Sequence, residues 1–226
     1  MDIQLNYYEV GNGMPLILLH GNGEDMTYFK YQVNCFSEHF RVIAVDSRGH
    51  GRTPRGEAPF TIRQFAEDLR CFMDEHHIMQ AHLLGYSDGG NVAMCFALKY
   101  PERVGKLVIN GANLYPAGVK MSAQMPITLQ YMQAKLAAKK DPMAHYESEL
   151  LGLMVNDPYI MPWSLRKLTM PALVIAGKDD LIREGHTKLI ARSLPNAELA
   201  ILPGGHAVAA MNPEAFNEEV LNFLLK

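Results

Sequence analysis

Short apolar runs recur along the chain, separated by longer segments whose apolar positions follow a helical period. Each run contains four to six nearly continuous apolar residues, which is typical of parallel strands buried on both faces. We therefore predict six strands, at residues 15–20, 41–46, 81–86, 106–111, 172–177 and 197–202.

The segments between these runs predict helices. The segment after Thr61 repeats apolar residues at helical spacing, and Thr61 is a suitable N-cap. A second helix is expected to end before Pro101, a third covers 183–197, and the last opens with Pro213 in its first turn. The alternation predicts one α/β domain over residues 1–226, built on a mostly parallel, doubly wound sheet with helices on both faces.

One interval, about residues 115–168, breaks this alternation because it contains no strand signal. Two segments in it, 125–140 and 141–157, are rich in methionine and leucine and are predicted to be helices. A structureless loop of such length is unusual, so we expect a small helical cap inserted over one end of the sheet. Its methionines are expected to serve packing first, although such adaptable side chains also suit the wall of an apolar binding site.

Composition narrows the class of protein. The chain has 226 residues, 48% of them hydrophobic and 20% charged, with a formal net charge of −3 and no basic run, which argues against a nucleic-acid partner. The amino terminus lacks the build of a signal peptide, and no apolar run suggests a membrane span. The three cysteines, Cys35, Cys71 and Cys95, have no metal-binding or disulfide spacing. We expect a cytoplasmic protein that uses neither a metal nor another cofactor.

The stretch Gly85-Tyr86-Ser87-Asp88-Gly89 matches G-x-S-x-G between a predicted strand and a predicted helix. A nucleophilic serine needs such a tight turn, where small flanking residues let strand and helix approach and the helix N-terminus faces developing negative charge. A phosphate-binding loop would also be glycine-rich, but it requires a following lysine or a third spaced glycine, and both are missing here. Ser87 is therefore the predicted nucleophile.

Two further glycine-rich turns supply candidate partners. The turn "HGNGED", at residues 20–25, follows a strand, and we expect the backbone N–H groups of Asn22 and Asp88 to form an oxyanion hole. An ordinary strand-to-helix turn is the alternative interpretation of this motif. The loop "LPGGHAV" contains His206, the candidate base. The other histidines considered, at positions 76, 77, 145 and 186, are expected to be surface or packing residues.

The candidate acid lies in "AGKDDL", where Asp179 and Asp180 follow a strand. Because neighbouring residues at a strand end point in opposite directions, only one of the two can meet a histidine above the sheet. The chain order serine, aspartate, histidine is the order expected for a catalytic triad on this kind of sheet.

These motifs, together with "DSRGHGRT" at 46–53 and "ALKYPERVGKLVINGA" at 97–112, resemble the α/β-hydrolase superfamily over essentially the whole chain. In that family the acid usually follows the strand-ending glycine by three residues, so the resemblance favours Asp180 over Asp179. It also implies a serine hydrolase that cleaves small-molecule esters without a cofactor.

The segments "GYSDGGN" and "GANLY" are similar to the valacyclovir-hydrolase-like branch, whose members cleave esters of α-amino acids. In that branch the acidic residue after the nucleophile holds the substrate ammonium, and Asp88 occupies this place. The alternative is that Asp88 caps its helix or bonds locally. Glu24 could add negative charge at the same mouth, with an ordinary surface residue as the alternative. Tyr86 is expected to line the pocket together with residues of the insertion: Met125, Met132, Met154 and Trp163.

The resemblance leaves other reactions open, since fold alone does not choose among them. The same triad carries out carbon–carbon bond hydrolysis and cofactor-free perhydrolysis. Haloalkane and epoxide chemistry is disfavoured, because that branch has an aspartate in the place of Ser87. A small-molecule receptor that keeps the triad without turnover is the non-enzymatic alternative. Oligomeric state is left open.

Overall fold

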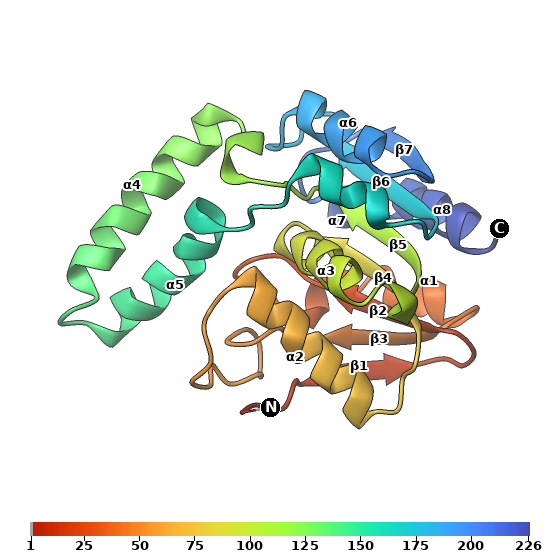
Figure 1. The fold of residues 1–226 in the computed structure, drawn as a ribbon, viewed down its shortest axis with the longest axis horizontal. Coiled ribbons are helices and arrows are strands. Elements are labelled where there is room, and N and C mark those ends of the chain that lie inside the picture. The colour runs from red at the N-terminus through yellow and green to blue at the C-terminus, as the bar shows by residue number, and fades with distance from the viewer. Residues whose placement is uncertain (1) are drawn as a thin grey trace.

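A seven-stranded sheet organises the chain (Figure 1). The computed structural model describes residues 2–226. The strands follow the spatial order β1-β3-β2-β4-β5-β6-β7, and all neighbouring pairs are parallel except β1 and β3. Their bounds are β1 Tyr7–Val10, β2 Pro15–Leu19, β3 Arg41–Val45, β4 Ala81–Tyr86, β5 Val104–Asn110, β6 Ala172–Gly177 and β7 Ala197–Leu202. The six strands predicted from apolar runs, and the mostly parallel sheet, are thus confirmed.

The sequence did not predict β1. This strand pairs with β3 in antiparallel register, with Tyr7 opposite Val45, and its side chains are largely exposed at the sheet edge. An edge strand that faces solvent needs no continuous apolar run, so the pattern used to find the buried strands misses it.

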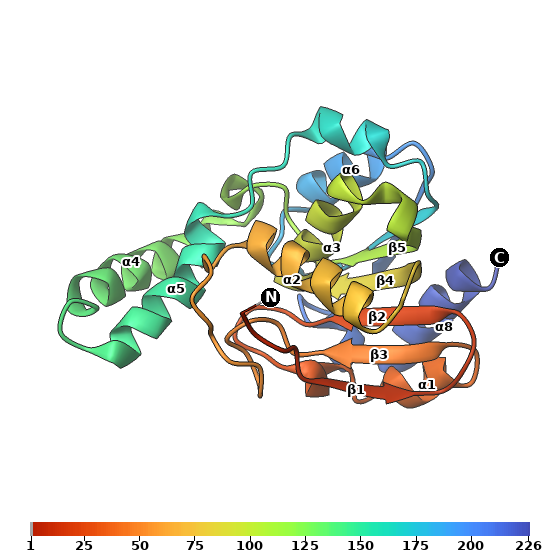
Figure 2. The ribbon, with the colours of Figure 1, turned by 60° about the horizontal axis from the view of Figure 1, so that its bottom comes forward.

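Helices cover both faces of the sheet (Figure 2). Phe65 of α2 and Val92 of α3 belong to the core on one face, whereas Phe36 of α1 and Phe216 of α8 belong to the core on the other. The helices outside the β5–β6 interval are α1 Val33–Ser37, α2 Ile62–Glu75, α3 Asp88–Lys99, α6 Glu184–Ser193, α7 Val208–Met211 and α8 Pro213–Leu224. The hydroxyl oxygen of Thr61 accepts a hydrogen bond from the Gln64 N–H at 3.2 Å, as expected of the N-cap of α2.

The interval between β5 and β6 forms a helical hairpin, α4 (Met121–Ala137) and α5 (Pro142–Asn156), which projects from the body of the molecule (Figure 1). Short 3-10 turns flank it at η3 (Pro116–Gly118) and η4 (Pro162–Lys167). Met125 and Met132 of α4 are exposed rather than turned toward the sheet, so these two methionines do not line the pocket as the sequence analysis expects. Within residues 2–226 no helix is long and apolar enough to cross a membrane.

A buried ion network holds the turn after β3. Arg48 is fully buried and donates to both carboxylate oxygens of Asp68 at 2.7 Å. It also donates to Asp2, at 2.7 and 3.0 Å, and so ties the amino-terminal segment to α2. Because a buried charge is costly without partners, this pairing accounts for the arginine in the "DSRGHGRT" segment.

Candidate active site

Ser87 lies on the tight turn between β4 and α3, with a φ of 54°. A non-glycine residue in this left-handed region is strained, and its neighbours hold it there. The Ser87 N–H donates to the Asn110 carbonyl at 2.8 Å. A Cβ at Gly89 would lie only 2.0 Å from the Leu19 oxygen, and one at Gly85 would lie 2.2 Å from the Gly89 oxygen. Only glycine at these two positions lets strand and helix meet so closely.

Three loops at the carboxyl ends of β4, β6 and β7 bring Ser87, Asp180 and His206 together. His206 Nε2 lies 3.0 Å from the Ser87 hydroxyl oxygen, and His206 Nδ1 lies 2.7 Å from Asp180 Oδ1. Asp180 is 3% exposed, and its Oδ1 also accepts the Ile182 N–H at 2.8 Å. Asp179 is exposed to solvent and does not contact the histidine. Of the two aspartates that the strand pattern left open, Asp180 is therefore the one beside His206.

The turn after β2 lies against this group. A Cβ at Gly21 would lie 2.9 Å from Tyr86 Cε1, so the absent side chain allows the close approach. The Asn22 side-chain amide donates to Asp88 Oδ2 at 2.9 Å and to the Leu150 carbonyl at 2.8 Å. Among residues 2–226, the backbone N–H groups of Asn22 and Asp88 donate none of the hydrogen bonds found outside helices and strands. Both donors are available to a ligand at the start of α3.

His20 fixes the start of the same turn. Its Nε2 accepts the Ser47 N–H at 3.0 Å, so its Nδ1 carries the proton and donates to the Gly21 carbonyl at 2.7 Å. Burial lowers the pKa of His20 to about 4, which keeps the imidazole neutral near neutral pH. His20 thus has a structural role in the "HGNG" motif.

A cavity of about 150 Å³ opens beside the Ser87 hydroxyl. Asp88 borders it, but the carboxylate is buried and both of its oxygens are engaged, Oδ2 by Asn22 and Oδ1 by the Asn91 amide at 3.0 Å. Burial raises the pKa of Asp88 above its ordinary value. This matches the alternative interpretation of Asp88, as a residue that bonds locally.

Glu24 borders the same cavity in a different way. Its Oε2 is buried and has no hydrogen-bond partner within residues 2–226. Burial raises the pKa of Glu24 above its ordinary value. The Tyr86 ring also lines the cavity and stacks on Tyr28, with ring centroids 4.2 Å apart. Glu24, rather than Asp88, is therefore the carboxylate that still has an oxygen to offer.

The two remaining residues expected in the pocket line different cavities. Met154 of α5 lines the cavity at Ser87, but Trp163 lines a different cavity, so the placement of Trp163 in the sequence analysis was wrong. The sequence places Trp163 in the cap interval, yet in the η4 turn it lines a cavity with Cys95 and Leu98 of α3. Six further residues that the sequence did not indicate line the cavity at Ser87: Asn113, Val119, Gln124, Ile127, Leu181 and Ile182. Of these, Leu181 and Ile182 directly follow Asp180, a proximity that could have identified them.

Comparison with known proteins identifies the family to which the chain belongs. The family model described as alpha/beta hydrolase fold matches residues 14–143. The chain belongs to this family. Within residues 2–226 no group of three or more histidine, cysteine, aspartate or glutamate side chains is arranged to hold a metal ion.

Curated relatives and solved structures extend over nearly the whole chain. A Caulobacter sp. (strain K31) protein called "Putative carbamate hydrolase RutD" is 30% identical over 96% of this chain and 95% of its own. A 2-hydroxy-6-oxononadienedioate/2-hydroxy-6-oxononatrienedioate hydrolase of Burkholderia vietnamiensis is 30% identical over 99% of this chain and 91% of its own. A hydrolase from Pseudomonas aeruginosa has a similar structure, with a TM-score of 0.82 and 27% identity over 98% of this chain and 94% of its own. This α/β hydrolase is thus a hydrolytic enzyme.

Proposed function

We propose that the chain is a serine hydrolase that cleaves small carboxylic esters through an acyl-enzyme formed on Ser87. The observation that carries the proposal is the continuous hydrogen-bonded relay from the Ser87 hydroxyl through His206 to the buried Asp180. A structural cluster would not need a half-buried serine held in a strained conformation at the edge of a cavity.

Each group in the relay has a role set by its contacts. His206 Nδ1 faces a carboxylate and carries the proton, so Nε2 is free to take the proton of Ser87 as the hydroxyl attacks the ester carbonyl. Asp180 holds this tautomer and stabilises the imidazolium that forms. His206 then gives the proton to the leaving alcohol, and a water molecule activated by the same nitrogen releases the acid and regenerates Ser87.

The backbone N–H groups of Asn22 and Asp88 are proposed to bind the oxyanion. Both are free of other acceptors outside helices and strands within residues 2–226, and the Asp88 N–H lies at the positive end of α3. One such donor typically contributes on the order of 10²–10³ in rate. The bonds from the Asn22 side chain to Asp88 and Leu150 hold the two donors in one position.

The size and lining of the cavity support a small substrate. A cavity of about 150 Å³ has room for a short acyl group, and Ile127 and Met154 supply apolar contacts from the hairpin. The unpartnered Glu24 oxygen favours an acyl group that carries an ammonium or another N–H donor, as an α-amino acid ester does. Glu24 is therefore proposed as the residue that recognises such a group, with Asp88 contributing longer-range charge.

Carbamate hydrolysis is the second candidate. It requires the same attack by Ser87, and relatives matched over nearly the whole chain have names that include carbamate hydrolase. The N–H of a carbamate would also find an acceptor in Glu24. Carbon–carbon bond hydrolysis would use the same relay. A relative is named as a hydrolase of 2-hydroxy-6-oxononadienedioate, but the small cavity fits such a long substrate less well.

The test compares turnover of 4-nitrophenyl acetate, a 4-nitrophenyl carbamate and a dienedioate-type ring-cleavage product. The Ser87→Ala variant serves as the blank. We expect multiple turnovers of the acetate, abolished by Ser87→Ala, and a mass increase of one acyl group on Ser87 in rapidly quenched samples. Activity near that of the native enzyme in Ser87→Ala would overturn the proposal. A trapped adduct that never turns over would instead indicate a receptor.

A further inference from the structure

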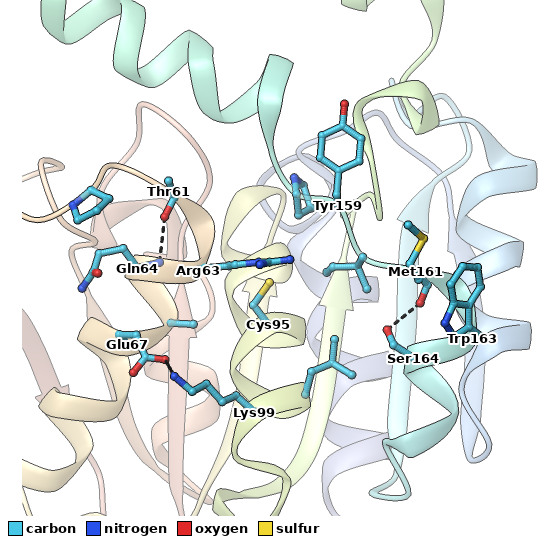
Figure 3. A pocket seen from close by; sticks show the side chains of 15 residues that line it. Thr61, Arg63, Gln64, Glu67, Cys95, Lys99, Tyr159, Met161, Trp163 and Ser164 are labelled. Carbon is cyan, nitrogen blue, oxygen red and sulfur yellow. Dashed lines mark hydrogen bonds and ion pairs between the residues drawn. The ribbon is translucent and has the colours of Figure 1, made fainter.

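A second, larger cavity of about 680 Å³ lies away from Ser87, between α2, α3 and the segment 158–164 (Figure 3). We call residues 158–164 the strap. Cys95 in the cavity wall stands eight residues along α3 from Ser87, which corresponds to about 12 Å along the helix. The volume falls within the range of small-molecule sites, and none of its lining residues borders the cavity at Ser87.

The strap is held firmly at its centre. The Ile160 N–H donates to the Leu114 carbonyl at 2.8 Å, and the Ile160 side chain is 5% exposed in the main core. Leu165, just past the strap, is fully buried. Around this anchor the strap presents three large exposed side chains, Tyr159, Met161 and Trp163. The cavity is therefore preformed, with exposed apolar groups at its rim and a hydrogen-bonded backbone beneath them.

The walls of the cavity are mainly apolar. Of the three charged side chains that line it, two are paired with each other and the third is not. The Lys99 ammonium is paired with the Glu67 carboxylate at 2.7 Å, so these two charges offset each other. Burial raises the pKa of the Cys95 thiol to about 12, so this side chain is neutral and acts as apolar wall. The Arg63 guanidinium extends into the middle of the cavity beside Cys95 (Figure 3).

Arg63 is exposed to solvent, and of the charged side chains lining this cavity it is the one without an ion-pair partner among residues 2–226. Its guanidinium forms no ion pair within 4.0 Å, whereas the other cation of the cavity, Lys99, is held by Glu67. Burial raises the pKa of Asp157, and the charge of Arg63 opposes that shift without forming an ion pair with it. Asp157 instead accepts the Ile62 N–H at 3.4 Å. A ligand anion would therefore not have to displace a carboxylate paired with Arg63.

We propose that this strap cavity binds a small aromatic or alicyclic monocarboxylate. Arg63 pairs with the carboxylate at the centre, and the apolar ring packs among Leu98, Ile160, Met161 and Trp163. The planar guanidinium fork suits a carboxylate, and a single unpaired cation matches a single negative charge. The site is independent of Ser87 and of the reaction proposed there.

Fluorescence of Trp163 can report binding, because it is the single tryptophan of the chain and is 65% exposed at the rim. Binding of an apolar ring should shield it and move its emission to shorter wavelength. The probe is 3-phenylpropanoate, compared with 3-phenylpropanamide and 3-phenylpropylammonium, which share the ring but not the charge. We expect saturable shifts with the carboxylate, and about fivefold or greater weakening for the amide and the ammonium.

Arg63→Gln should remove this preference, so that carboxylate and amide bind alike. The Arg63 side chain makes no hydrogen bond or ion pair within residues 2–226, so the fold should be retained, which circular dichroism can check. Arg166→Gln is the matched control, because Arg166 is exposed on η4 just beyond the strap but does not line the cavity. It should leave binding unchanged.

Three results would each overturn the proposal: no saturable shift up to millimolar carboxylate, equal affinity for all three probes, or an unchanged preference in Arg63→Gln. Competitive inhibition of ester hydrolysis with the same constant as the fluorescence change would also do so, because it would assign the probe to the cavity at Ser87. Failure of ester turnover, by contrast, concerns only the proposed function and leaves this titration valid.

Discussion

The two cavities differ in the way that their polar groups are held. At Ser87 the side chains of His206, Asp180 and Asn22 each have specific hydrogen-bond partners, and the space beside them is about 150 Å³. In the strap cavity the central cation, Arg63, has no such partner and the space is about 680 Å³. Groups fixed by neighbours suit chemistry, since reacting atoms must be positioned closely. A free cation in an apolar cleft suits binding.

The contrast also teaches that size does not identify an active site. The larger cavity lies against helix surfaces, whereas the smaller one lies where the carboxyl ends of parallel strands meet a helix N-terminus. This is the place where open α/β sheets usually bind their ligands. Each of the following changes should affect one cavity and leave the other intact.

The largest effect is expected from Asp180→Asn. Removing this carboxylate should favour the wrong tautomer of His206 and lower kcat for 4-nitrophenyl acetate by about 10⁴-fold. The neighbouring Asp179→Asn is the matched control and should stay within about twofold, because Asp179 is exposed and does not contact His206. Similar losses in both variants would disprove the assignment of Asp180. Neither change should alter the Trp163 emission shift with 3-phenylpropanoate.

Acyl-chain length should have the next largest effect. The small cavity should accept 4-nitrophenyl butyrate but exclude much of an octanoyl chain, lowering kcat/KM by a factor of about ten or more. Met154→Ala should recover part of the loss by enlarging the cavity. Met161→Ala, which changes the strap cavity, should not. An enzyme that prefers octanoate would show that the hairpin does not limit the pocket.

Glu24→Gln tests recognition of an amino group. In the native enzyme we expect alanyl esters to react about tenfold faster than propionyl esters, and this ratio of kcat/KM values should fall toward one in the variant. Burial raises the pKa of Glu24, so its charge is present above that raised pKa and is lost as the pH falls through it. The alanyl preference should therefore disappear at a higher pH than for an ordinary glutamate.

A parallel Asp88→Asn variant separates the two carboxylates. Should it abolish the preference while Glu24→Gln keeps it, the ammonium would be recognised by Asp88 as the resemblance first suggested. A native ratio near one, at every pH, would leave a general short-chain esterase.

The smallest effect is expected from Trp163→Leu. Since Trp163 lines the strap cavity, kcat/KM for small esters should remain within about twofold of the native value. A tenfold rise in KM would show that the substrate reaches the strap and that the two cavities act as one.

The sequence alone predicted the elements that form the body of the molecule. Strands buried on both faces must be apolar throughout, so β2 to β7 were visible as runs, and Thr61 marked the start of α2. The glycines around Ser87 indicated that strand and helix come into close contact there, since a side chain at either position would clash with backbone. The sequence also indicated Ser87, Asp180 and His206 as residues that the fold would bring together, although their catalytic roles stay a prediction.

Tertiary structure decided what local pattern does not encode. Asp180, not Asp179, contacts His206, and Asp88 accepts hydrogen bonds from two side-chain amides. Glu24 keeps one carboxylate oxygen without a hydrogen-bond partner within residues 2–226. Tertiary structure also turned Trp163 away from Ser87 and left Arg63 unpaired in a second cavity. The hydrophobic pattern of a segment predicts which of its residues are buried, because apolar residues face the core. Which atoms face one another across a cavity depends on how distant loops pack, and only the folded chain determines that.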